Sequence, residues 1–167
     1  MDVFGRKRDK PDASLAEDSA GVKFPPPFIY LIGLILGLII SRYIPVRVIP
    51  TAIVWPLGIV LLIAWIALWV PALASFFRVR TPLPPNKPTS ALVTSGVFGI
   101  TRNPLYLGLV AFYLAIAVLA NSLWAIVLII PVVAIVKVAV IAREERYLER
   151  KFGREYTDYK QRVRRWL

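Results

Sequence analysis

The chain has 167 residues, of which 57% are hydrophobic and 19% are charged. Its mean hydropathy is +0.64, and its apolar share exceeds the roughly 45–50% of soluble domains, so the composition argues against a soluble globule. Lys and Arg number 21 against 10 Asp and Glu, which gives a net charge of +11, and His and Cys are absent from the sequence. This excludes disulfides, zinc sites built on Cys or His, Cys nucleophiles and Ser-His-Asp triads, and we expect no metal site.

Residues 1–23 predict a flexible tail on the cytoplasmic side, because charges of both signs outnumber apolar residues there. The apolar run begins after Pro25-Pro26-Pro27, which is late for a signal peptide, and no small-residue cleavage site follows it. We therefore expect residues 24–80 to hold retained membrane spans rather than a cleaved signal.

Two spans are predicted in this first half, since crossing the hydrocarbon takes about 20 apolar residues in a helix. The first covers 28–44, and the second lies within 48–77, an uncharged stretch in which Pro56 and Pro71 are expected kinks. Gly33 and Gly37 form a G-x-x-x-G pattern in the first span, which predicts close packing against another helix.

The uncharged stretch 104–136 is too long for one span, and Asn121-Ser122 within it predicts a tight turn. We expect a helical hairpin of residues 105–120 and 122–142. Lys137 near the end of the second arm is a candidate functional residue by its position, although snorkelling to the headgroups is the favoured reading. The fold class is thus all-α integral membrane, with about four transmembrane helices.

The basic residues indicate the orientation of these helices. The loop between the first two spans has only Arg42 and Arg47 at its edges, whereas both tails and the 78–103 loop are rich in Lys and Arg. Because Lys and Arg accumulate on the cytoplasmic side, we predict both termini there, and the compact four-span length favours a bacterial inner membrane. Anionic headgroups account for the positive charge, so membrane lipids are the expected partners and nucleic acid is not.

The loop before the third span has features of a ligand-binding site as well as of a simple connector. Gly96 and Gly99 permit a positive φ or a close approach, Asn103 suits an N-cap and Pro104 suits the first helical turn. A helix N-terminus at this position is able to hold a polar ligand, and a simply capped connector is the alternative. Spacing alone leaves both open.

Residues 142–167 predict an amphipathic cytoplasmic helix, bent at Gly153, with an apolar residue at every third or fourth position. Lying on the membrane surface through its basic face is one reading. Glu144 and Glu145 at its start gain nothing from anionic lipid, so either Arg143 or Arg146 neutralises them or they await a cationic ligand.

Three pieces of the region 81–167 form an ordered set: L-V-T-S-G-V-F at 92–98, R-N-P-L-Y-L-G at 102–108, and E-E-x-x-L followed by F-G-x-E-Y-x-x-Y and V between 144 and 163. This set resembles the isoprenylcysteine carboxyl methyltransferase family, membrane methyltransferases that also resemble phospholipid N-methyltransferases. The resemblance implies S-adenosyl-L-methionine (SAM) as methyl donor, bound between the membrane helices and the C-terminal segment.

Matched residue by residue, the resemblance implies a set of donor-binding residues. Aromatic faces suit a sulfonium or adenine, and a carboxylate suits a ribose or a positive charge. The set is Ser90, Ala91, Leu92, Val93, Phe98, Asn103, Pro104, Leu105, Tyr106 and Glu144. The sequence also lacks the G-x-G-x-x-G of soluble Rossmann-type cofactor sites.

The chain departs from the family pattern on the acceptor side. Ser90 and Asn103 stand where the eukaryotic motif has His, and Val140 stands where the family has its substrate-side Arg. The resemblance implies a lipidic acceptor, either the carboxylate of a prenylcysteine-like molecule or a lipid amine, and the sequence leaves these two open.

The candidate catalytic residues are Arg102, Tyr106 and Glu145. For a carboxylate acceptor, Arg102, Arg143 or Lys137 would replace the missing Arg. For an amine, Glu145 or Tyr106 would act as the base. Two other functions compete with these readings: an NADPH-dependent sterol-reductase-like enzyme, and a non-catalytic membrane relative of the methyltransferases.

Overall fold

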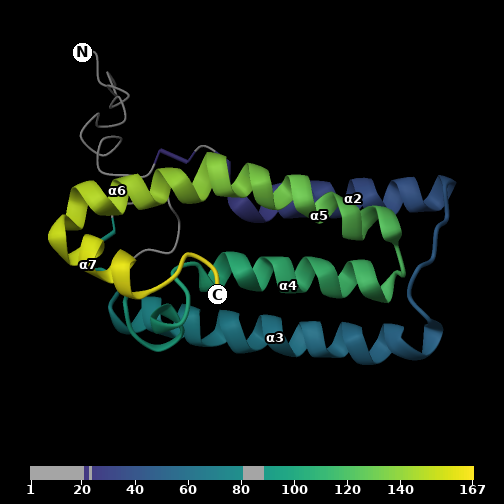
Figure 1. Ribbon diagram of the computed structural model, residues 1–167, viewed down its shortest axis with the longest axis horizontal. Helices are drawn as coiled ribbons and strands as arrows, with labels where there is room; N and C mark the ends of the chain where they lie inside the picture. Colours follow the sequence, from purple (N-terminus) through teal and green to yellow (C-terminus); the bar gives the residue numbers. More distant parts are fainter. Residues whose placement is uncertain (1–20, 23, 81–88) are drawn as a thin grey trace, which may run out of the picture.

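The computed structural model describes residues 21–22, 24–80 and 89–167. The predicted tail at 1–20 and 23 and the Pro-rich stretch 81–88 lie outside the described residues. In the described part, every regular element is a helix, which confirms the predicted all-α class (Figure 1). Its elements are α2 (Pro26–Tyr43), α3 (Thr51–Arg78), the 3-10 turn η1 (Gly96–Gly99), α4 (Pro104–Leu119), α5 (Leu123–Val136), the π-helical turn η2 (Lys137–Ile141), α6 (Ala142–Phe152) and α7 (Arg154–Arg162).

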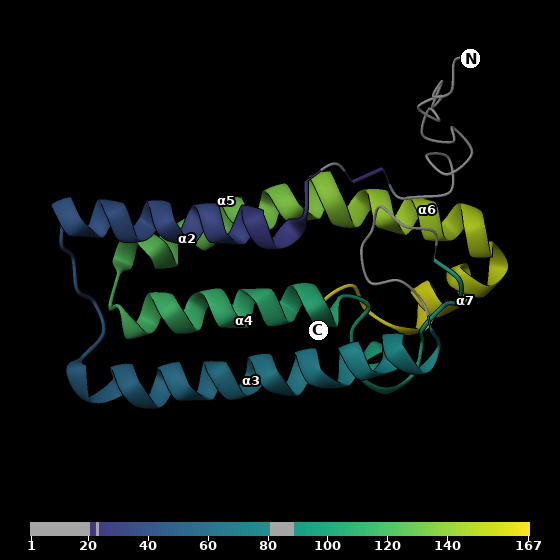
Figure 2. The ribbon, with the colours of Figure 1, turned by 180° about the vertical axis from the view of Figure 1, so that it is seen from behind.

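Four apolar helices run along a common direction, and α3 continues through Pro56 and Pro71 without ending (Figures 1 and 2). Of the helices in the described ranges, three are long and apolar enough to cross a membrane: α2, α3 and the continuous helix Leu123–Phe152. α4 is apolar but has only 16 residues. Apart from that shorter fourth member, the predicted bundle is confirmed.

Small residues bring the helices together in pairs, α2 against α5 and α3 against α4. A Cβ atom on Gly37 would collide with the backbone of Ala125, and one on Gly33 would collide with the side chain of Val132. The predicted close packing at these two glycines is therefore confirmed. In the other pair, Gly108 faces Trp69, whose Nε1 donates a 2.9 Å hydrogen bond to the Leu105 carbonyl.

The predicted turn at Asn121-Ser122 is confirmed, and it fastens the far end of the bundle. Asn121 adopts a φ of 44°, and the Ser122 hydroxyl caps α5 by accepting a 3.1 Å hydrogen bond from the Ala125 amide. The Asn121 side chain also accepts from the Ile49 amide at 3.1 Å and donates to the Ile49 carbonyl at 2.8 Å. The first loop and the hairpin turn are thus joined at one end.

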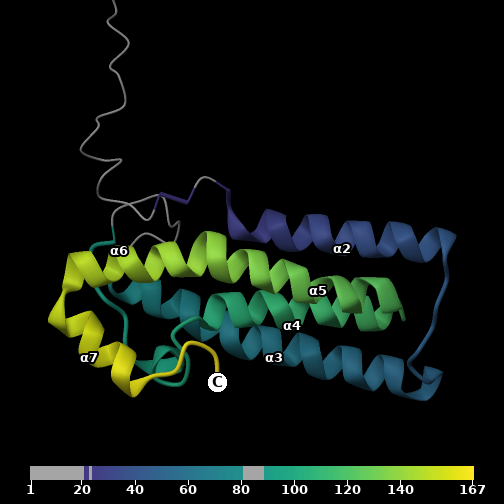
Figure 3. The ribbon, with the colours of Figure 1, turned by 45° about the horizontal axis from the view of Figure 1, so that its top comes forward.

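The C-terminal region differs from its prediction in two ways. First, α6 continues the span directly, because η2 joins it to α5 and carries the helix straight beyond the bundle (Figure 1). Second, helix ends at Arg162, and the last residues leave the helical path. The predicted bend is confirmed: Gly153 has a φ of 52°, and α7 folds back across the end of the bundle (Figure 3).

The segments that the charge pattern predicts to share one side of the membrane lie together at this end of the molecule. The first turn of α2, the last turn of α3, the first turn of α4 and both C-terminal helices all lie here, opposite the hairpin turn (Figures 1 and 2). An even number of antiparallel helices accounts for the arrangement. The side of the membrane that this end faces stays a prediction.

Candidate functional site

A cavity of about 340 Å³ lies at this end, walled by the start of α2, the end of α3, the 89–106 segment, α6 and α7. The wall includes many residues predicted from the sequence. They are Leu92, Val93, Phe98, Asn103, Pro104, Leu105, Tyr106 and Glu144 from the donor set, and Arg102, Tyr106 and Glu145 from the catalytic set. Ser90 and Ala91 are not part of this wall, and the Ser90 hydroxyl donates to the Arg80 carbonyl at 3.4 Å.

Aromatic side chains make up much of the wall. Phe98 packs edge-on against Phe76 at 5.5 Å between ring centroids, and the Tyr159 hydroxyl donates a 2.7 Å hydrogen bond to the Phe98 carbonyl. Burial raises the pKa of Tyr159 to about 12, which keeps that donor protonated at neutral pH. The 3-10 turn that carries Phe98 is thereby fixed to α7.

Several residues of the wall were not predicted from the sequence, chiefly Trp69, Phe76, Tyr147, Tyr156 and Tyr159. Tyr156 and Tyr159 belong to the apolar stripe of residues 142–167, so the signal for burial was present but not the signal for a cavity. Tyr147 lies beside that stripe, and its hydroxyl accepts a 3.1 Å hydrogen bond from the Thr89 amide. Only the fold shows that Tyr147 and Thr89 meet.

Glu144 and Tyr106 form the polar centre of this largely apolar wall. The Tyr106 hydroxyl donates a 2.8 Å hydrogen bond to Oε1 of Glu144 and thereby links the first turns of α4 and α6. Within the described ranges, Glu144 makes no ion pair. Its carboxyl group is therefore not neutralised by a basic side chain of the described ranges and faces the cavity.

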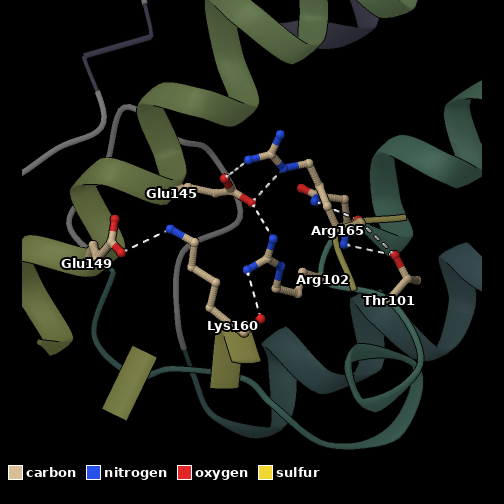
Figure 4. A network of polar contacts seen from close by, with 7 residues as sticks. Thr101, Arg102, Glu145, Glu149, Lys160 and Arg165 are labelled. Carbon is tan, nitrogen blue, oxygen red and sulfur yellow. Dashed lines mark hydrogen bonds and ion pairs between the residues drawn. The ribbon is translucent and has the colours of Figure 1, made fainter. Parts of the chain in front are cut away.

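Glu145 has a different environment, shown in Figure 4. Its Oε1 pairs with Nη2 of Arg102 at 3.1 Å and with Nε of Arg165 at 3.0 Å, and its Oε2 accepts from Nη2 of Arg165 at 2.5 Å. The hydrogen bond to Glu145 raises the pKa of Arg165, which secures its positive charge. Both carboxylate oxygens are occupied, which disfavours Glu145 as a proton acceptor.

Of the two readings left open for the glutamates, neutralisation by Arg143 or Arg146 is not what the structure shows. Arg143 donates instead to the Gly21 carbonyl at 3.4 Å, and Arg146 donates to the Ala142 carbonyl at 3.0 Å within its own helix. Because side chains one or two residues apart on a helix point in different directions, neither guanidinium reaches the cavity face. The partners of Glu145 come from the loop before α4 and from the C-terminal segment.

Asn103 stands at the N-cap position of α4, as predicted, but its side chain does not cap the helix. Its Nδ2 donates to the Arg165 carbonyl at 2.9 Å, and the Thr101 hydroxyl donates to the same oxygen at 3.2 Å. The Arg102 amide donates to the Arg164 carbonyl at 3.0 Å. The capping role is thus replaced by a junction that fixes the C-terminal segment beside the cavity.

Three basic residues were candidates to hold an acceptor carboxylate, and the wall includes Arg102 alone among them. Lys137 and Arg143 are exposed and lie outside the wall. Val140, at the family's substrate-side Arg position, is buried in the π-helical turn and also lies outside it. Of the three candidates, only Arg102 therefore lies on the described wall.

The fold and the cavity define the class: an integral membrane protein with a largely apolar cavity at one end of its helical bundle. The family model described as phospholipid methyltransferase matches residues 52–155, more than half of the chain. The chain therefore belongs to the phospholipid methyltransferase family and is a membrane methyltransferase acting on lipid-related substrates. This confirms the resemblance to membrane methyltransferases over residues 81–155 and extends it through α3.

Comparison with known proteins adds one relative. The chain is 51% identical over 65 residues to an uncharacterized protein of Haemophilus influenzae, which is 38% of this chain and the whole of that protein. No solved structure matches. The assignment of this chain to a family of methyltransferases therefore rests on the family model.

Proposed function

We propose that this membrane methyltransferase uses SAM as its methyl donor and methylates a lipid amine. The observation that carries the proposal is the Glu144 carboxylate, which has Tyr106 as its described hydrogen-bond partner and lies in the wall of an aromatic cavity. A carboxylate so placed, without an ion pair to a described residue, suits a cationic ligand, and the sulfonium of SAM is such a cation.

The cavity fits a ligand of this kind in size and chemistry. Its volume of about 340 Å³ lies within the roughly 300–1,000 Å³ of small-molecule sites. Phe98 and Tyr106 offer aromatic faces to a sulfonium or an adenine, and Glu144 offers oxygens to a ribose or a positive charge. Leu92, Val93 and the Asn103-Pro104-Leu105 backbone complete the proposed donor site, with Ser90 and Ala91 just outside it.

When bound, SAM supplies a methyl group that an acceptor takes by in-line displacement. The chain's contribution is to hold the two reactants in line and to exclude water, and both tasks suit an apolar cavity. Tyr106 holds the Glu144 carboxylate in place through its hydroxyl. Glu145, paired with two arginines, acts as a positioning residue.

An amine acceptor is favoured over a carboxylate because of the charges on the wall. A buried Val140 stands where the isoprenylcysteine carboxyl methyltransferase resemblance implies a substrate-side Arg, and neither Lys137 nor Arg143 lies on the described wall. A protonated amine must lose a proton before it attacks, and Glu144 is the wall carboxylate with an uncommitted oxygen. We therefore assign the proton to Glu144 rather than to Glu145.

Calorimetric titration of the detergent-purified protein tests the donor. Micromolar binding of SAM together with no binding of NADPH is the expected result. Binding of NADPH instead would indicate a sterol-reductase-like enzyme, and silence for both ligands in folded protein would indicate a non-catalytic relative. Transfer of labelled methyl groups to phosphatidylethanolamine, with a farnesylcysteine as the comparison, then tests the acceptor.

We also propose a bacterial inner membrane as the location, with both termini in the cytoplasm. The proposal is supported by the basic residues of α6 and α7, which lie at the same end as the start of α2. SAM is a cytosolic metabolite, so a cavity at this end would face its supply.

A further inference from the structure

Arg102 has an unusual position for a charged side chain. Only 8% of the side chain is exposed, and it belongs to the wall of the cavity. Its Nη2 pairs with Glu145, and its Nη1 reaches the Lys160 carbonyl at 3.5 Å. Its Nε is buried and has no hydrogen-bond partner in the part of the chain that the structure describes. A buried donor without a partner is costly, which points to a ligand that supplies the missing acceptor.

The charges around Arg102 point to the same kind of ligand. Arg102 and Arg165 share the single carboxylate of Glu145, so the three side chains together carry one excess positive charge (Figure 4). Arg102 and Glu145 are nearly enclosed, with 8% and 9% of their side chains exposed. Arg165 is 33% exposed, so the excess charge is shared between an enclosed and a partly exposed guanidinium, and an opposite charge bound beside Arg102 would stabilise it.

The Glu145–Arg165 pair also controls where the Arg102 guanidinium lies. Arg165 binds Glu145 with both Nε and Nη2, a two-point contact that fixes the carboxylate. The Arg165 carbonyl is itself held by Thr101 and Asn103, the residues on either side of Arg102. The C-terminal segment and the loop before α4 therefore fix Arg102 from two directions.

We infer that Arg102, held by Glu145 and Arg165, is an oxyanion subsite of the cavity, in which Nε of Arg102 donates to a carboxylate or phosphate oxygen of the bound molecule. The identity of that molecule rests on the proposed function. SAM offers the carboxylate of its methionine part, and a phospholipid acceptor offers its phosphodiester. Arg165 and Glu145 are positioning residues in this subsite.

Two pairs of probes, each differing in one oxyanion, test the subsite in the intact detergent-purified chain. The first pair is SAM and decarboxylated SAM, and the second is lysophosphatidylethanolamine and oleylamine. We expect the oxyanion-bearing member of one pair to bind at least about tenfold more tightly, the effect of one charged hydrogen bond. The pair that shows this preference identifies the source of the oxyanion.

The variant Arg102→Lys keeps the charge but removes Nε and the planar fork. In this variant, the ratio of the affinities for the two probes of that pair is expected to fall to about one, while the oxyanion-free probe binds as before. Arg165→Lys should reduce the preference partly, because it loosens Glu145 without touching the ligand. The matched control is Lys160→Met, which removes a half-exposed positive charge paired with Glu149 nearby.

Binding of oxyanion-free probes and the unfolding temperature report whether each variant is folded. The subsite is overturned if the unmodified protein shows no preference for the oxyanion-bearing probe of either pair. It is also overturned if that preference persists in Arg102→Lys. If SAM binds but neither preference depends on Arg102, the proposed function stands and the subsite fails. If SAM does not bind while the lysophospholipid preference depends on Arg102, the subsite stands and the proposed donor fails.

Discussion

The hydroxyl of Tyr106 donates a hydrogen bond of 2.8 Å to Oε1 of Glu144, which joins the first turn of α4 to the first turn of α6. The bond leaves the second carboxylate oxygen available to the cavity and connects the two motif pieces R-N-P-L-Y and E-E. Residues 38 positions apart in the chain thus form one polar centre. The helical hairpin between them is what brings them together.

Glu144→Gln is expected to weaken SAM binding by at least about tenfold, because it replaces one carboxylate oxygen with an amide that cannot carry a negative charge and leaves the shape of the side chain unchanged. Calorimetric titration measures the change. Glu149→Gln is the matched control, since Glu149 is half-exposed, pairs with Lys160 and lies outside the cavity wall. Unchanged affinity in the Glu144 variant would contradict the assignment of the donor site.

Tyr106→Phe keeps an aromatic face on the wall and removes the hydrogen bond to Glu144. A charged hydrogen bond contributes about 1.5–3 kcal/mol, part of which water replaces, so we expect SAM binding to weaken by about three- to tenfold. The same substitution made in Glu144→Gln should have a clearly smaller effect, because the two residues are coupled. Additive losses in the double variant would show that Tyr106 acts independently of Glu144.

Most of the fold was predictable because its signals are local. Apolar run lengths identify the helices, the G-x-x-x-G pattern identifies a close contact, and Asn121-Ser122 identifies the hairpin turn. The junction between α5 and α6 was not predictable in this way, since a π-helical turn depends on packing around Val140 and Ile141, both fully buried. The predicted amphipathic helix of residues 142–167 therefore begins as a direct continuation of the span, which the sequence did not indicate.

The site was predictable only in part, and motif resemblance supplied that part. Eight of the ten predicted donor-binding residues are on the cavity wall, since Ser90 and Ala91 are not. The partners of Glu145 were not predictable, because Arg102 and Arg165 lie 43 and 20 positions from it in the chain. Side-chain pairing over such separations depends on how α7 folds back, and no local pattern in the sequence encodes it.

The contact between α2 and α5 predicts a graded loss of stability. In Gly37→Ala the new methyl group meets the backbone of Ala125, which cannot move independently, and we expect a loss of about 1–3 kcal/mol. In Gly33→Ala it meets a methyl group of the Val132 side chain rather than backbone, so the loss should be smaller. Thermal unfolding in detergent shows which of the two variants loses more stability. Leu36→Ala, on the exposed face of α2, is the control, and equal effects of both glycine variants would contradict this packing.

The predicted orientation is testable with single cysteines, because the natural sequence has none. Tyr43→Cys lies at the first loop and Asp158→Cys lies on α7, at opposite ends of the bundle, and both positions are exposed. A membrane-impermeant maleimide should label position 43 in spheroplasts and position 158 in inverted vesicles. The reverse pattern would place the cavity end outside the cytoplasm.

Asn103→Ala is expected to loosen the C-terminal segment, because it removes the 2.9 Å hydrogen bond from Nδ2 to the Arg165 carbonyl. Thr101 still donates to the same oxygen, so we expect a loss of stability near 1 kcal/mol rather than unfolding. Hydrogen exchange should accelerate at the Arg102 amide, which donates to the Arg164 carbonyl, and stay unchanged at the Ala125 amide in the distant hairpin turn. Had Asn103 capped α4 instead, the faster exchange would be at the first amides of that helix, so the position of the change distinguishes the two roles.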